Sequence, residues 1–268
     1  MTWAMRHAEF IGTGAARLFL LAYAPRNSDI AHRCFVVAPA FAEEMNRSRD
    51  LLRQFGLAAA ERGDAVVIPD LRGTGDSPGD FGDYGITDWH EDLTQSIAWT
   101  RKRFGGAPVT LLGLRFGALL TPHVSARADV NSLLLWQPVT EGRRMVREFL
   151  RIWSAANMGT GDDPRTMLQR DGSLEVAGYR VSSELIDSIE QLTLAPEADR
   201  ALAIHWVEAG AALSVRSERA IAALRDAGHN VDTATADSPP FWRVQERVDA
   251  SAFVAASAPG GAALDTHG

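Results

Sequence analysis

The sequence predicts an α/β fold in which helices flank a mainly parallel sheet of eight strands. Two features of the 268-residue chain predict it. Short apolar runs alternate with stretches whose apolar residues recur at helical spacing. Glycine or proline ends most of these segments. Buried strands joined through helices need crossover connections, and such connections place the strands parallel in one sheet.

The first half of the chain contains most of the expected elements. A Gly-Thr-Gly turn at 12–14 joins the first two strands, and later strands are short buried runs that stop at Pro39, Asp70 or Pro138. The helix that begins at Ile86 repeats apolar residues at i, i+3, i+7 and i+11 before Gly105 ends it. The expected strands are 7–11, 17–23, 33–38, 65–69, 109–112 and 132–137, and the expected helices are 46–62, 86–104 and 116–127.

The second half contains an interruption and then a return of the same pattern. Residues 140–196 read as a helix at 141–156, a glycine-rich loop and further helical pieces without a strand crossover, which predicts a small helical cap over the strand ends. Strands at 200–207 and 230–236, a helix at 214–227 and a last helix from about 241 follow. We therefore expect a core of 1–139 and 197–250, a cap insertion of 140–196 and a flexible tail of 251–268.

Charge and composition exclude several classes of function. The formal net charge of −7 argues against nucleic acid, because phosphate binding needs clustered positive charge. The basic residues Arg143, Arg144, Arg147 and Arg151 are expected to form a solvated helix face. The single cysteine, Cys34, lies in an apolar run and is expected to pack in the core. No stretch resembles a signal peptide or is long enough to span a bilayer, so we expect a cytoplasmic protein without a membrane span.

The most informative motif is the pentapeptide Gly113-Leu114-Arg115-Phe116-Gly117. It follows a strand directly and opens a helix, which is the setting of the nucleophile elbow G-x-S-x-G in α/β-hydrolases. Arg115 stands where that motif has its serine. A guanidinium stays protonated at neutral pH and has no acceptor lone pair, so Arg115 cannot attack a carbonyl.

The partners that a nucleophile needs are incomplete as well. Hydrolases of this fold carry an acid after the penultimate strand, where Glu208 occurs, and a histidine after the last strand, where residues 236–242 contain none. Ser77, in the glycine-rich loop at 71–85, is expected to be structural. No Ser-His-Asp triad can be read, so whether the chain is an enzyme stays open, and we expect no metal or cofactor.

The sequence retains the geometry to bind a negative oxygen. The backbone N–H of Phe116 lies at a helix start, and that of Phe41 lies in the loop after the third strand, where a second donor is usual. Arg115 would add a full positive charge to such a pocket.

Two arrangements of Arg115 stay open at this point. In the first, one of the candidate carboxylates Glu43, Glu44 and Glu208 forms an internal salt bridge with Arg115 and fixes the loop. In the second, Arg115 is free to bind the carboxylate or phosphate of a ligand.

Five segments of the chain resemble one known family. They are PAFAEEMNRSR at 39–49, GTGDSPGDF at 73–81, GLRFG at 113–117, VAGY at 176–179 and PPFW at 239–242. From about Phe35 to Gln245 the chain is similar to the exosortase A system-associated hydrolase type 2 family of the α/β-hydrolase superfamily. The resemblance implies a setting in exopolysaccharide production and PEP-CTERM protein sorting, protein partners from that locus, and an arginine at the elbow as a regular family feature. It supplies no reaction, because fold does not determine function.

Three functions are compatible with these observations. The first is a catalytically silent relative that binds a small anionic or acylated ligand through Arg115, Phe41 and Phe116. The second is an active ester, thioester or acyl hydrolase that uses an unrecognised nucleophile or an activated water, with one of the three candidate carboxylates as the base. The third is a scaffold protein that docks to other proteins of the locus through its cap.

Overall fold

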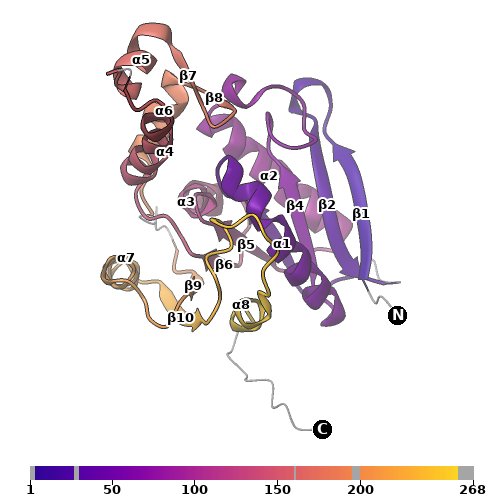
Figure 1. Ribbon diagram of the computed structural model, residues 1–268. Coiled ribbons are helices and arrows are strands. Elements are labelled where there is room, and N and C mark those ends of the chain that lie inside the picture. The colour runs from indigo at the N-terminus through magenta and orange to yellow at the C-terminus, as the bar shows by residue number, and fades with distance from the viewer. Residues whose placement is uncertain (1–3, 27–29, 160, 195–199, 259–268) are drawn as a thin grey trace.

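The computed structural model describes residues 4–26, 30–159, 161–194 and 200–258. Its centre is an eight-stranded sheet in the order β1-β2-β4-β3-β5-β6-β9-β10 (Figure 1). Strand β2 pairs antiparallel with β1 and β4, and the other neighbouring strands are parallel. This is the α/β-hydrolase fold, as the sequence predicts. The strands are Ala4–Ile11 (β1), Leu18–Pro25 (β2), Cys34–Ala38 (β3), Ala65–Asp70 (β4), Val109–Leu114 (β5), Ser132–Trp136 (β6), Ala203–Ala209 (β9) and Asn230–Ala236 (β10).

Helices cover both faces of the sheet, which explains why the central strands β3 and β5 are buried along their whole length. One apolar core holds side chains from α2, α3 and α7, and the other holds side chains from α1 and α8. These helices are Glu43–Glu61 (α1), Ile86–Arg103 (α2), Gly117–Arg127 (α3), Val215–Asp226 (α7) and Ser251–Ala256 (α8), and short 3-10 turns lie at Gly14–Ala16 and Phe81–Asp83. Among the described helices, none has the length and apolar character needed to cross a bilayer.

The segment between β6 and β9 forms a cap at one end of the sheet (Figure 1). It contains Gly142–Ala156 (α4), Pro164–Asp171 (α5), Ser173–Val176 (β7), Tyr179–Ser182 (β8) and Ser183–Gln191 (α6). The antiparallel hairpin β7–β8 is absent from the sequence prediction, which has only helical pieces here. Its strands are four residues long, too short to show a period, but its two-residue loop of Ala177 and Gly178 has the left-handed φ angles of 51° and 85° that tight hairpins require.

The β7–β8 hairpin connects the cap to the core through side-chain hydrogen bonds and one close backbone contact. Arg180 donates a hydrogen bond to Asp83 at 2.9 Å, in the glycine-rich loop. A Cβ at Gly82 would lie 2.7 Å from the Arg180 carbonyl oxygen, so only glycine allows the two backbones to approach this closely. Tyr179 bonds to Asn46 and Glu43 at the start of α1. The cap therefore contacts the core through the loop and helix that border the candidate site.

Two predicted boundaries at the C-terminal end differ from the structure. The last helix begins at Ser251 and not near 241, since residues 241–250 run as turns and irregular chain. Residues 251–256, which the sequence analysis places in a flexible tail, form α8. The reason is Phe253, which is fully buried against the rings of Trp136 and Phe241. Residues 259–268 of the predicted tail lie outside the described residues.

Candidate functional site

Arg115 lies at the sharp turn between β5 and α3. Its φ of 53° is left-handed, and its backbone is held on both sides. The N–H donates to the carbonyl of Trp136 at 2.9 Å, and the carbonyl accepts from Val139 at 3.0 Å and from Ala118 at 3.2 Å. This is the strand–turn–helix geometry that the sequence predicts, and it projects the residue beyond the strand ends.

The two glycines of the pentapeptide have a steric role. A Cβ at Gly117 would lie 1.9 Å from the carbonyl oxygen of Ala38 in β3, and one at Gly113 would lie 2.7 Å from the Cα of Ala118. Helix α3 therefore begins in direct contact with two strands, which only glycine permits at these positions.

The side chain of Arg115 is engaged on three sides. Its Nε and Nη2 donate to the two carboxylate oxygens of Glu44 at 3.1 and 3.0 Å, a bidentate ion pair. Its Nη1 donates to the carbonyl of Gln137 at 3.2 Å. The guanidinium carbon lies 4.9 Å from the ring centroid of Trp242, within cation–π range. The structure thus shows Arg115 in an internal salt bridge, the first of the two arrangements left open by the sequence.

Glu44 reaches Arg115 because of how α1 begins. The preceding residue Ala42 has a left-handed φ of 51°, which turns the chain sharply after β3. Glu43 and Glu44 then occupy the first turn of α1, where the positive end of the helix dipole favours a carboxylate. The Glu44 side chain is 33% exposed and that of Arg115 14%, so the pair lies at the border between protein and solvent.

The other two candidate carboxylates do not contact Arg115. Glu43 accepts hydrogen bonds from Asn46 at 3.0 Å and from the Tyr179 hydroxyl at 3.2 Å. Glu208 is buried at 4% exposure and accepts from the indole N–H of Trp206 at 2.8 Å. The structure brings only Glu44 to the elbow and gives Glu208 a packing partner in its own strand.

Trp242 is a site residue that sequence reasoning missed. It lies in the segment after β10, where hydrolases of this fold have their histidine, and it is 7% exposed. Its ring packs edge-on against Phe241 at 5.0 Å and covers the Arg115 guanidinium. The only signal in the sequence is the PPFW motif, which carries no chemistry by itself.

The elbow faces a cavity of about 300 Å³, which we call the cap cavity. Arg115, Glu44 and Trp242 line it from the core, and Met145, Phe149 and Ile152 line it from α4 of the cap. Among its described lining residues there is no serine, threonine, cysteine or histidine. The cavity therefore combines charged side chains with an apolar wall. Its described lining does not include a serine, threonine or cysteine nucleophile paired with a histidine base.

A second cavity of about 240 Å³, the loop cavity, lies beside the first. Phe41 and Tyr179 border both, whereas Phe116 lines only the loop cavity and Arg115 only the cap cavity. No hydrogen bond joins the Phe41 or Phe116 N–H to another described residue. The structure thus separates the expected amide donors from the guanidinium, with Phe41 between the two cavities.

Ser77 and Cys34 have the structural roles that the sequence predicts. The Ser77 hydroxyl donates to the carbonyl of Asp70 and accepts from the N–H of Phe19, so it joins β2 to the end of β4. Cys34 is fully buried in β3, and burial raises the pKa of its thiol to about 12. Neither side chain lines the two cavities.

The described histidines lie away from the elbow. His90 and His123 stack on each other, with ring centroids 4.0 Å apart, between α2 and α3. His205 contacts Asp232 and the carbonyl of Ala256. His229 precedes β10 at the opposite edge of the sheet, as expected, and His267 lies outside the described residues. Within the part of the chain that the structure describes, no group of three or more potential ligands is placed to hold a metal ion.

Comparison with solved structures finds proteins that share this architecture. Est1E from Butyrivibrio proteoclasticus, solved with ferulic acid bound, is 16% identical over 85% of this chain and 88% of that chain, with a TM-score of 0.64. DcsB in complex with its substrate analogue is 14% identical over 93% and 96%, with a TM-score of 0.63. A putative hydrolase from Agrobacterium vitis is 17% identical over 87% and 89%, with a TM-score of 0.54.

These likenesses show the α/β-hydrolase fold over most of the chain. No protein-family model matches the chain, and no curated protein matches it.

Proposed function

We propose that this α/β-hydrolase-fold protein binds a small amphipathic anion in the cap cavity and does not hydrolyse esters. The ligand has a carboxylate or similar oxyanion that meets Arg115 and an apolar acyl part that lies against the cap. The proposal rests on one observation: the Arg115 guanidinium lies at the elbow, contacts Glu44 and Trp242, and lines the cap cavity.

The absence of hydrolysis follows from the chemistry of the lining residues. Ester cleavage by this fold needs an oxygen or sulfur nucleophile and a base that takes its proton. Arg115 offers neither, and Trp242 fills the segment that would carry the histidine. The described residues of the cap cavity include no hydroxyl nucleophile other than the phenol of Tyr179, whose pKa is raised by burial and by Glu43.

The class of ligand follows from the two sides of the cap cavity, which are Arg115 on the core side and the apolar residues of α4 on the cap side. An arginine has five N–H donors, and the contacts to Glu44 and Gln137 use three of those on Arg115, so two remain on Nη1 and Nη2. Facing them, Met145, Phe149 and Ile152 form an apolar wall on α4, and the Ile152 side chain is half exposed. A cavity of about 300 Å³ is at the lower end of the size range of small-molecule sites.

Phe41 and Phe116 extend the proposal into the loop cavity. Their N–H groups are free among the described residues, and Phe41 borders both cavities. A ligand long enough to pass Phe41 would place a carbonyl oxygen on these amides while its anionic end stays on Arg115.

The motif resemblance adds a biological setting to the proposal. If the chain belongs to the exosortase A system-associated hydrolase type 2 family, the ligand comes from exopolysaccharide production or from processing of PEP-CTERM proteins in the cytoplasm. Proteins of that locus would then be the partners that present or receive it.

The test compares a carboxylate with its uncharged counterpart. We expect the protein to bind octanoate more tightly than octanol in titration calorimetry. Arg115→Gln should weaken octanoate about 10- to 100-fold, as loss of a charged hydrogen bond would, and leave octanol nearly unchanged. Arg243→Gln is the matched control, because Arg243 also lines the cavity but is exposed, and we expect less than about a threefold effect.

Activity assays complete the test. We expect no labelling by a fluorophosphonate probe and no turnover of nitrophenyl esters of short or long acyl chains. Turnover that persists in Arg115→Gln and disappears in Glu44→Gln would overturn the proposal and favour a hydrolase in which Glu44 activates a water. Equal binding of octanoate by the parent protein and Arg115→Gln would also overturn it.

A further inference from the structure

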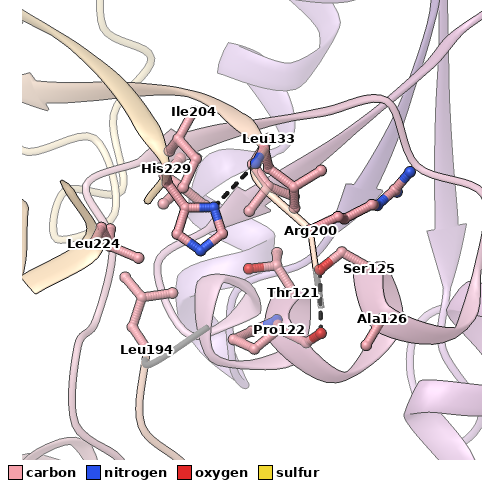
Figure 2. A pocket seen from close by; sticks show the side chains of 12 residues that line it. Thr121, Pro122, Ser125, Ala126, Leu133, Leu194, Arg200, Ile204, Leu224 and His229 are labelled. Atoms are coloured by element: carbon pink, nitrogen blue, oxygen red, sulfur yellow. Dashed lines mark hydrogen bonds between the residues drawn. The ribbon is translucent and has the colours of Figure 1, made fainter. Parts of the chain in front are cut away.

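A third cavity lies at the end of the sheet opposite the elbow. It has a volume of about 190 Å³ and is formed by α3, β6, β9 and α7. His229, which directly precedes β10, projects into it (Figure 2). Its walls are mainly apolar, with Leu133, Ile204 and Leu224 among them. None of its described lining residues borders the cap cavity or the loop cavity, so it is a separate site.

His229 carries a polar atom without a partner inside this cavity. The residue is 5% exposed, and its Nε2 has no hydrogen-bond partner among the residues that the structure describes. Its Nδ1 accepts a hydrogen bond from the backbone N–H of Leu202 at 3.1 Å, drawn as a dashed line in Figure 2. The figure shows the other ring nitrogen pointing toward the space beside Thr121 and Pro122.

The contact with Leu202 fixes the state of the ring. Since Nδ1 accepts an N–H, it cannot itself carry a proton, and a doubly protonated ring would set two donors against each other. Burial also lowers the pKa of His229, which favours the neutral form. A neutral imidazole with a bare Nδ1 has its proton on Nε2. His229 therefore presents an N–H donor to the cavity.

An unpaired buried donor is unfavourable unless something in the cavity accepts from it. Two hydroxyls also line the cavity. Thr121 donates to the Ala118 carbonyl at 2.8 Å, and Ser125 donates to the Pro122 carbonyl at 3.1 Å, which leaves oxygen lone pairs on both. Arg200 also lines the cavity, and its Nη2 donates to the carbonyl of Val130. The cavity thus offers the Nε2 donor of His229 and acceptor oxygens within a mainly apolar wall.

The volume sets the size of the occupant. A water molecule takes up about 30 Å³ of liquid, and an apolar cavity of about 150 Å³ holds benzene, so 190 Å³ admits one six-membered ring with a substituent. We propose that this cavity is a binding site for a small uncharged molecule with a single apolar ring and a hydroxyl oxygen that accepts from His229 Nε2. The hydroxyl hydrogen can in turn be donated to Thr121.

The experiment uses phenol and toluene, which differ by a hydroxyl and a methyl group. In a long-range proton–nitrogen NMR spectrum of the full-length protein, His229 should show the Nε2-protonated form. Phenol should shift that resonance, and toluene should shift it much less. His229→Phe keeps a ring but removes the donor, and it should weaken phenol about tenfold without weakening toluene. Arg115→Gln should leave phenol binding unchanged, so this site and the cap cavity are tested independently.

Three results would overturn the inference. One is a ring protonated on Nδ1 in the free protein, which needs no variant to detect. Another is phenol and toluene binding equally to the parent protein. The third is a phenol-soaked crystal structure in which water alone occupies the cavity, or in which phenol binds with its oxygen more than about 3.5 Å from Nε2. A phenolic oxygen within hydrogen-bond distance of Nε2 would support it.

Discussion

An anionic ligand on Arg115 would lie beside the negative charge of Glu44, so Glu44→Gln should strengthen ligand binding. In the structure, Nε and Nη2 of Arg115 both point at the Glu44 carboxylate. An incoming carboxylate on the two remaining N–H groups, on Nη1 and Nη2, would be repelled by the Glu44 carboxylate on the same guanidinium. Replacing the carboxylate with an uncharged amide removes the competing charge and leaves a side chain of similar size.

The exposures of the two side chains set the magnitude. A fully exposed ion pair contributes about 0.2–1 kcal/mol, and a buried charged hydrogen bond about 1.5–3 kcal/mol. At 14% and 33% side-chain exposure, Arg115 and Glu44 lie between these cases. We therefore expect a difference of about 1–2 kcal/mol, which corresponds to octanoate binding about 5- to 30-fold more tightly to Glu44→Gln.

Titration calorimetry with octanoate measures this change, and Glu43→Gln is its matched control. Glu43 lies in the same helix turn and has the same charge, but it bonds to Asn46 and Tyr179 and not to Arg115. The control should change octanoate affinity much less. In the double variant Glu44→Gln with Arg115→Gln the gain should disappear, because the ligand and Glu44 are coupled through the Arg115 guanidinium. Octanoate binding that is unchanged or weaker in Glu44→Gln would refute the reasoning.

Three further predictions concern the scaffold around the site. Gly117→Ala should destabilise the protein by about 3 kcal/mol or more in urea unfolding, because the new Cβ would lie 1.9 Å from the Ala38 carbonyl. Gly85→Ala, whose Cβ would meet nothing nearer than 3.9 Å, should cost less than about 1 kcal/mol, and equal losses would disprove the steric argument. His90 has its pKa lowered to about 4 by burial and by the neighbouring His123 and Arg127, so on acidification the unfolded chain takes up this proton at a higher pH than the folded protein does. Stability should therefore fall by about 1–2 kcal/mol as pH drops from 6.5 to 4, and His90→Leu should lack that part of the slope. The thiol of Cys34, with a pKa of about 12, should not react with a disulfide reagent at pH 8 until urea unfolds the protein; rapid labelling of the native state would contradict its burial.

The fold was predictable because its signals are local. Buried strands such as β5 and amphipathic helices such as α2 repeat within a few residues of each other, and that period is legible in one sequence. The elbow was predictable for the same reason, since strand, turn and helix follow directly around Arg115. The hairpin at Tyr179 was missed because its strands are too short to show a period.

The partners of Arg115 were less predictable because they come from distant parts of the chain. Glu43 and Glu44 are adjacent and chemically equal in the sequence, and only the turn at Ala42 decides which of them reaches the guanidinium. Trp242, which follows the last strand and lies more than a hundred residues after Arg115 in the sequence, contacts the guanidinium. Composition and period contain no information about such contacts, so the sequence left several carboxylates open and did not name the tryptophan.

The conformation of the elbow explains why a cation can lie at the cavity floor. A non-glycine residue in the left-handed region costs about 1–2 kcal/mol relative to an ordinary helical conformation. Arg115 adopts it because its N–H and carbonyl are bonded to Trp136 and Val139, and because Gly117 lets α3 begin against Ala38. This turn carries the side chain past the ends of the strands, so that its charge meets Glu44 at the border with solvent. The same backbone that can expose a nucleophile thus exposes a guanidinium, and the chemistry of the site follows from the side chain and not from the fold.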